Sequence, residues 1–194
     1  MIREQPGGWA FDVPGINRTN GMPILVADNS ESQYRGMLYL NWADQKNGAN
    51  DTDIWFSRSS NGGDTWTVPA KVNDDEGGKH QFLSWMAQDP TTGYLYILYY
   101  DRRAYEDNQT DVYLAYSNNG GITFENRKIS DSPFTPEAEY FFGDYTNITD
   151  YDGRVDAVWT RMDDGKTSII ASVFEDDELF GAPEGKGKKK KKKK

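Results

Sequence analysis

The sequence predicts an all-β fold built from repeated four-stranded units, and two observations support this. The first is an internal repeat: residues 36–75 and 93–132 follow one template, with an offset of 57 residues that later grows to 58. The second is that aromatic residues, 14% of the chain, fall in short alternating runs broken by Gly, Asn and Asp. The matched segments are 36–40 (GMLYL) with 93–97 (GYLYI), 52–56 (TDIWF) with 110–114 (TDVYL), and 59–66 (SSNGGDTW) with 117–124 (SNNGGITF).

Repeats of about 40–50 residues made of short strands are typical of β-propeller blades. The first unit predicts strands at 23–27, 36–42, 53–59 and 65–72. The second predicts strands at 83–88, 93–100, 111–117 and 123–129. A third unit predicts strands at 144–149, 153–159 and 167–174, and its fourth strand is missing or degenerate.

The predicted organisation is a lead-in segment at 1–22, a propeller segment at 23–180 and a Lys-rich tail at 181–194. The blades are expected at about 23–73, 83–131 and 144–180. A closed propeller takes about four to eight blades, so three blades leave an open edge on each side. Either the chain is half of a six-bladed propeller, which we favour, or another chain covers its edges, for example a second copy in a head-to-tail ring.

The tail is expected to be an addition to the natural sequence or a placeholder, with a natural basic arm as the alternative. Its residues 185–194 hold eight of the 22 Lys and Arg residues, so the rest of the chain carries 14 basic against 31 acidic residues. Such an acidic body argues against nucleic-acid partners. No apolar run approaches a membrane span, and the absence of cysteine excludes disulfides and thiolate metal sites.

Two segments at equivalent positions of the repeat resemble the Asp-box, or BNR repeat, of sialidases, whose pattern is Ser-x-Asp-x-Gly-x-Thr-Trp. Asn61 and Asn119 stand where that family has Asp. The resemblance implies a sialidase-like β-propeller, with each motif a structural hairpin turn on the face opposite the ligand site. The matching residues are Ser59, Asn61, Gly63, Thr65 and Trp66 in the first unit, and Ser117, Asn119, Gly121, Thr123 and Phe124 in the second.

Two further segments, YDRR at 100–103 and FGDY at 142–145, are similar to those of exported bacterial sialidase-like propeller proteins. This resemblance implies an extracellular or cell-surface location.

Strand direction places the loops that follow the second strands on one face, opposite the Asp-box turns. We expect loops 44–51, 101–110 and 161–166 there, together with the crossing loops 73–82 and 131–142. Asp44, Asp101 and Arg161 come at equivalent strand ends, and Arg102 and Arg103 adjoin them. These arginines could clamp a carboxylate by bidentate bonds, as the sialidase resemblance implies; the alternative is that they form structural ion pairs.

Four other residues, in these loops or in the strand that follows one of them, are candidates for a ligand site. His80, the only histidine, could act as a general base or bind a sugar hydroxyl, or it could be polar surface. Trp85 could stack on a sugar ring or belong to the blade core. Glu139 and Tyr140 place a carboxylate beside a phenol, but neighbours in an extended segment point opposite ways. No nucleophile can be assigned.

The acidic clusters 73–76 and 150–152 offer hard oxygen ligands suited to calcium, with Asp74, Asp75, Asp150 and Asp152 as the weak candidates. Solvated turns are the alternative, and no metal is assigned. No cofactor is required by the predicted function, and calcium is the one ion considered.

Three hypotheses follow. The first is an extracellular sialidase-like propeller module that binds glycan or a surface protein at its upper face. The second is part of an exo-acting glycoside hydrolase of sialidase type, so whether the chain is an enzyme stays open. The third is a surface-assembly module that self-associates through its open blade edges.

Overall fold

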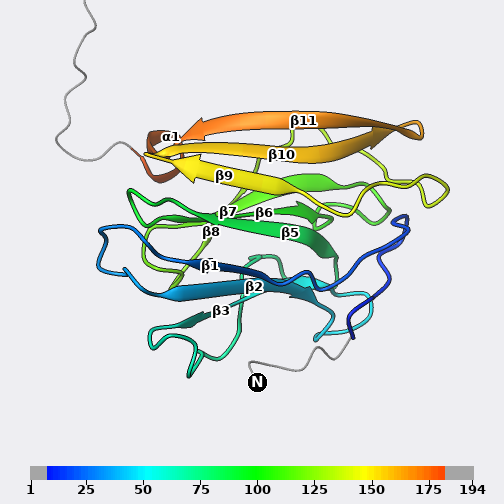
Figure 1. Ribbon diagram of the computed structural model, residues 1–194. Helices are drawn as coiled ribbons and strands as arrows, with labels where there is room; N and C mark the ends of the chain where they lie inside the picture. The colour runs from blue at the N-terminus through cyan, green and yellow to red at the C-terminus, as the bar shows by residue number, and fades with distance from the viewer. Residues whose placement is uncertain (1–7, 182–194) are drawn as a thin grey trace, which may run out of the picture.

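The computed structural model describes residues 8–181, which form a nearly all-β structure with one short helix (Figure 1). The elements in chain order are β1 (Ile24–Ala27), β2 (Leu38–Asp44), β3 (Asp53–Ser59), β4 (Ala70–Lys71), β5 (Gln81–Gln88), β6 (Leu95–Asp101), β7 (Asp111–Ser117), β8 (Glu125–Lys128), β9 (Asn147–Tyr151), β10 (Arg154–Asp163), β11 (Lys166–Glu175) and α1 (Asp176–Phe180). No helix in this part of the chain is long and apolar enough to cross a membrane.

The strands form three antiparallel sheets stacked one on the next, and they confirm the predicted blades (Figure 1). Blade 1 has the order β1-β2-β3-β4, blade 2 the order β5-β6-β7-β8, and blade 3 contains β9, β10 and β11. The first strands of the blades lie side by side, because β5 contacts both β1 and β9. This is the arrangement of propeller blades around a shared axis.

The sequence pattern predicted the bounds of the middle strands of each blade more accurately than those of the outer strands. The strands predicted at 53–59 and 111–117 have those bounds. The fourth strands are shorter than predicted, because the turns before them extend through residues 60–69 and 118–124. In blade 3 no fourth strand is present within residues 8–181, and α1 follows β11 directly. Most of the predicted tail, residues 182–194, lies outside the described residues.

Blade 2 supplies the centre of the core because blades cover both of its flanks. Every residue of β6 is buried, and strands buried on both faces read as continuous apolar runs. One flank carries Tyr96 and Tyr100, and the Tyr100 hydroxyl donates to the backbone oxygen of Thr160 in blade 3 at 2.9 Å. On the other side, Asn41 Nδ2 of blade 1 donates to Ser84 Oγ at 2.7 Å.

The two turns that follow β3 and β7 have the same hydrogen-bond pattern. Ser59 Oγ accepts from the backbone N–H of Gly63 at 3.0 Å, and Ser117 Oγ accepts from that of Gly121 at 3.1 Å. The Asn61 and Asn119 side chains accept from Thr65 and Thr123 N–H in the same way. These turns lie at the opposite ends of β3 and β7 from the hairpins that join β2 to β3 and β6 to β7.

Candidate functional site

A buried polar network joins blades 1 and 2 at the predicted ligand face. Asn73 Nδ2 donates to Asp53 Oδ1 and to Gln81 Oε1, both at 2.8 Å. Gln81 in turn lies 3.5 Å from Asp101 Oδ1. Asp44 is also buried at the end of β2. Most carboxylates of this face therefore interact with protein groups in and between the blades.

The predicted arginines are engaged in separate contacts and do not converge on one point. Arg103 pairs with Asp101 and Asp74, and its guanidinium lies 4.2 Å from the ring centroid of Tyr113. Arg161 pairs with Asp163 at 2.6 Å and lies over a phenylalanine ring. This geometry fits the structural alternative, and the carboxylate clamp stays a prediction.

Arg102 is buried, and its Nη1 donates to the backbone oxygen of Pro14 at 2.7 Å while its Nε donates to Thr110 at 3.0 Å. Burial lowers the pKa of Arg102 to about 10. The side chain therefore holds the lead-in segment against blade 2.

His80 is buried, with Nδ1 2.9 Å from Thr52 Oγ1. Burial, reinforced by the charge of Arg102, lowers the pKa of His80 to about 4. The expectation of polar surface for His80 is therefore wrong for this structure. Glu139 and Tyr140 are exposed, and the Tyr140 ring lies against Gly165 in the β10–β11 hairpin.

The acidic residues considered for calcium do not come together. No group of three or more metal-ligating residues that could hold an ion is found within residues 8–181. Asp74 pairs with Arg103, and Asp75 lies 3.2 Å from Lys71 Nζ. Asp150 was expected in a loop but lies in β9, because the first strand of blade 3 begins later than predicted, and Asp152 is at the β9–β10 turn with φ of 52°.

The lead-in segment contacts blades 1 and 2 and the segment that leads into blade 3, at the predicted ligand face. The backbone oxygen of Asp12 accepts from Gln45 Nε2 at 2.9 Å in blade 1. Pro14 meets Arg102 in blade 2, as described above, and Arg18 pairs with Asp144 ahead of blade 3. Three of its apolar side chains are buried, namely Phe11, Val13 and Ile16. Sequence reasoning missed this covering, although these spaced apolar residues were a signal for it.

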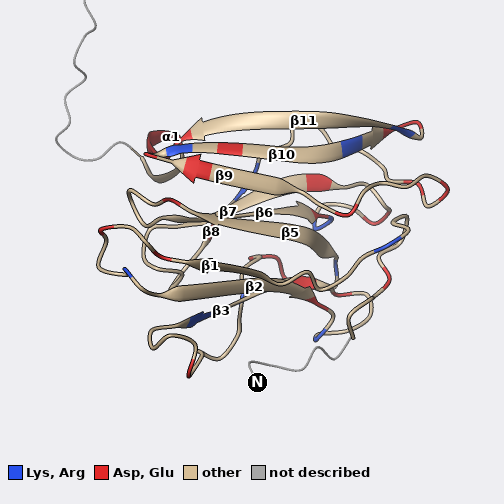
Figure 2. Ribbon diagram, in the orientation of Figure 1, with Lys and Arg blue, Asp and Glu red and all other residues tan. Residues whose placement is uncertain are grey.

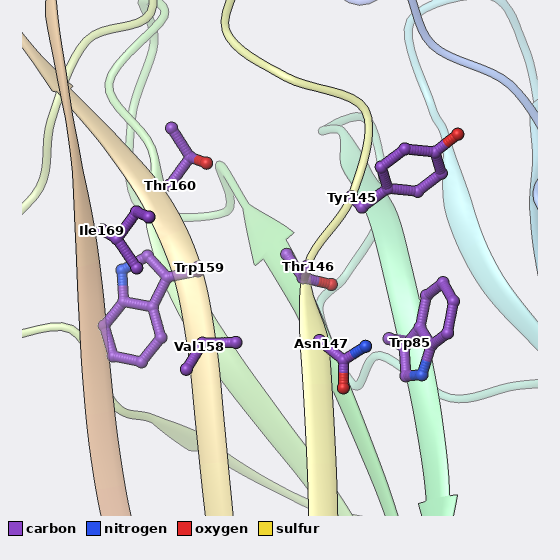
Figure 3. A pocket seen from close by; sticks show the side chains of 8 residues that line it. All are labelled: Trp85, Tyr145, Thr146, Asn147, Val158, Trp159, Thr160 and Ile169. Atoms are coloured by element: carbon purple, nitrogen blue, oxygen red, sulfur yellow. The ribbon is translucent and has the colours of Figure 1, made fainter.

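A hollow of about 460 Å³ is lined by residues of blades 2 and 3 (Figure 3). Trp85 comes from β5, and the segment that leads into β9 supplies Tyr145. Figure 3 shows these two rings on the same side of the hollow, across from Ile169 of β11. The lining residues are Trp85, Tyr145, Thr146, Asn147, Val158, Trp159, Thr160 and Ile169, and we call this set the aromatic cleft.

An irregularity in β5 aims Trp85 into the aromatic cleft. The pairing of β5 with β6 shifts register between Phe82 and Trp85, and Leu83 has φ of 50°, a rare value for a branched residue. Thr146 Oγ1 donates to the backbone oxygen of Leu83 at 2.9 Å, so blade 3 holds this conformation in place. Bulges of this kind redirect side chains and occur near functional sites.

Of the cleft residues, sequence reasoning had found only Trp85. Tyr145 has 61% of its surface exposed, and Asn147 and Thr160 add amide and hydroxyl groups. None of the lining residues is charged. The aromatic cleft can therefore stack on a ring and donate or accept a few hydrogen bonds, which suits a neutral polar ligand.

No protein-family model matches the chain, and no curated protein matches it significantly. Several solved structures do match the chain. An α-L-arabinanase from Penicillium chrysogenum, complexed with arabinobiose, has a TM-score of 0.64 at 16% identity, over 90% of this chain and 50% of that one. An α-L-arabinofuranosidase, arb93a, from Fusarium graminearum gives 0.61 at 14% identity, over 84% and 48%. The Hadza microbial sialidase Hz136 gives 0.54 at 19% identity, over 78% and 35%.

At these identities the likeness establishes the fold: the three sheets form a β-propeller segment of the kind found in propeller glycosidases. The chain spans about a third to a half of the length of the structures it matches.

Proposed function

We propose that this propeller segment binds a glycan in the aromatic cleft. The observation that carries the proposal is the pair of rings, Trp85 and Tyr145, brought to one hollow from two neighbouring blades. Aromatic faces pack on the apolar faces of sugar rings, and the amide of Asn147 and the hydroxyl of Thr160 would bond sugar hydroxyls. A glycan fits an acidic body better than a nucleic acid does.

The fold comparisons support this proposal, because the matched proteins include one complexed with arabinobiose. The sialidase type, the Asp-box nature of the two turns and an extracellular or cell-surface location belong to the same proposal. The repeated Ser-Asn-Gly-Thr bonding of the turns supports the Asp-box assignment. We propose that binding needs no cofactor; a loss of affinity in EDTA, restored by calcium, would contradict that part.

Titration calorimetry with arabinobiose and with sialyllactose tests the proposal. We expect arabinobiose, which is neutral, to bind the wild-type chain more tightly than sialyllactose, whose carboxylate meets no cationic side chain among the cleft residues. Trp85→Ala should weaken arabinobiose binding about tenfold, given about 0.5–1.5 kcal/mol for aromatic contact beyond the buried area. Tyr145→Ala should weaken it as well. Tyr151→Ala is the matched control, because Tyr151 is 71% exposed in the same blade but does not line the cleft. Unchanged affinity in both cleft variants, or no binding of either sugar, would sink the proposal.

A second candidate function is part of an exo-acting glycoside hydrolase. One observation favours it: the chain covers only half of the arabinanase it resembles, so catalytic groups of a complete propeller could come from elsewhere. Release of fluorophore from a sialoside would support it if Arg161→Ala abolished the release. Arg161 is a better choice than the buried Arg102, whose removal would also disturb packing.

A further inference from the structure

The outer edge of blade 3 differs from those of the other two blades. Blade 1 ends in the two-residue strand β4, and blade 2 ends in β8, whose four residues include three charged ones. Short or charged edge strands are how proteins avoid pairing with other chains. In blade 3 the edge is β11, which has ten residues and, within the described structure, pairs only with β10 (Figure 1).

The chemistry of β11 favours pairing with another strand. Figure 2 shows charge only at its two ends, where Lys166 and Glu175 lie, and the eight residues between them are uncharged. Ile169 is 82% exposed and Val173 is 49% exposed, on the same face of the strand. A long, uncharged edge strand that exposes β-branched residues is a template for strand addition.

We propose that two copies of this chain join through β11, antiparallel and about a two-fold axis, to make one continuous sheet. A two-fold axis perpendicular to the sheet keeps the same face of both copies on one side. Residues that lie opposite each other must then point to the same face, so the axis passes through one residue of β11, which pairs with its own counterpart in the second copy. With Ala171 at the axis, Ile169 lies opposite Val173 of the second copy, so two exposed β-branched side chains meet, and Lys166 lies beyond the end of the partner's β11. With Ile170 at the axis, Lys166 would meet an aromatic residue instead, so the axis at Ala171 gives the better cross-strand pairs.

Pairing of this kind covers the exposed β11 edge of both copies. Because the backbone N–H and C=O groups of the two edges bond one another, association through β11 stops at the dimer and does not continue into a fibre. The aromatic cleft includes Ile169, whose side chain stays on the face of the sheet, so pairing along the edge does not require the cleft to close.

A cysteine placed at the axis tests the register directly. The chain has no cysteine, so Ala171→Cys introduces the only thiol. Opposed residues of an antiparallel pair have Cα atoms about 4.5–5.5 Å apart, which falls within the range of disulfides. Under mild oxidation we expect Ala171→Cys to form a covalent dimer at least about tenfold faster than Val68→Cys, an exposed position outside β11, because pairing raises the effective thiol concentration.

Mass measurement in solution provides the second readout. The wild-type chain should be a dimer, and Ile169→Lys with Val173→Lys should be a monomer with an unchanged circular dichroism spectrum, because both side chains are exposed. Ile122→Lys, at another exposed isoleucine, should remain a dimer. Three outcomes would overturn the proposal: a monomeric wild type, a dimer that persists in the double lysine variant, or equal cross-linking rates at positions 171 and 68. A persistent dimer would indicate that the copies associate through the flank of a blade.

Discussion

The guanidinium of Arg103 lies 2.8 Å from the fully buried carboxylate of Asp101, measured from Nη2 to Oδ2. The backbone N–H of Arg103 also donates to the other oxygen of Asp101 at 2.7 Å. Burial raises the pKa of Asp101, although the bonds from Arg103 oppose that effect. Because Arg103 also contacts Asp74, this ion pair ties the end of β6 to the loop that links blades 1 and 2.

Removal of Arg103 should therefore destabilise the protein strongly. Arg103→Ala leaves a buried carboxylate without its cation, and we expect a loss of about 3 kcal/mol in the free energy of unfolding. Combining it with Asp101→Asn should recover part of the loss. Urea denaturation measures both. Arg154→Ala is the control, because the Arg154–Asp156 pair is exposed and should contribute far less to stability. Similar losses for Arg103→Ala and Arg154→Ala would contradict the argument.

The buried histidine predicts a loss of stability in mild acid. The pKa of His80 is about 4 in the folded state against 6.5 ordinarily, so between these pH values the unfolded chain binds more protons. Stability therefore falls as the pH drops from about 6.5 to 4, by up to about 3 kcal/mol from this group. His80→Gln should remove this contribution, so the difference in unfolding free energy between wild type and variant should change across that window. A constant difference from pH 7 to pH 4 would be the contrary result.

Asp150 predicts the opposite dependence. Burial, together with the charges of Asp89 and Asp176, raises its pKa to about 7. Asp150 Oδ2 is buried with no hydrogen-bond partner among the described residues. The folded state therefore binds the proton more tightly, and this group costs stability as the pH rises from about 4 through 7.

Replacing Asp150 by a neutral isostere should consequently stabilise the protein only where the carboxylate is ionised. We expect Asp150→Asn to add about 2 kcal/mol at pH 8, a figure reduced to allow for partial solvent screening, and almost nothing at pH 4. Urea unfolding at the two pH values measures this. Asp152→Asn, on the exposed turn, should have little effect at either pH; a gain at pH 4 equal to that at pH 8 would count against a titration effect.

The strands could be predicted because their signals are local. The strand 53–59 and its counterpart 111–117 each begin with Asp, continue with at least three apolar residues and end at the Ser that opens the turn, so the repeat predicted their bounds. Blade 3 lacks a turn of that kind, and nothing in the sequence anchored its first strand. That is why Asp150 was placed in a loop and not in β9.

The candidate site depended on contacts that no local pattern reports. Trp85 enters the aromatic cleft because of a bulge at Leu83, a residue type that gives no signal for positive φ. Its partner Tyr145 is distant in sequence, and only the docking of blade 3 brings them together. The burial of Arg102 likewise depends on the lead-in segment, because Pro14, which accepts its hydrogen bond, is 88 residues away in sequence.

Gly121 offers a test of how the second turn packs onto blade 1. Its φ is +72°, and a methyl group added there would overlap the ring of Phe56 in β3. Gly62 has nearly the same φ, +71°, but open space around it. Gly62→Ala should therefore cost only the conformational penalty, about 1 kcal/mol, whereas Gly121→Ala adds a steric clash of about 1–3 kcal/mol with a ring of the core. Denaturant unfolding of the two variants measures the difference. Equal losses of stability would mean that the second turn does not pack against Phe56 as described. Adding Phe56→Leu should restore part of the stability lost in Gly121→Ala, but none of that lost in Gly62→Ala.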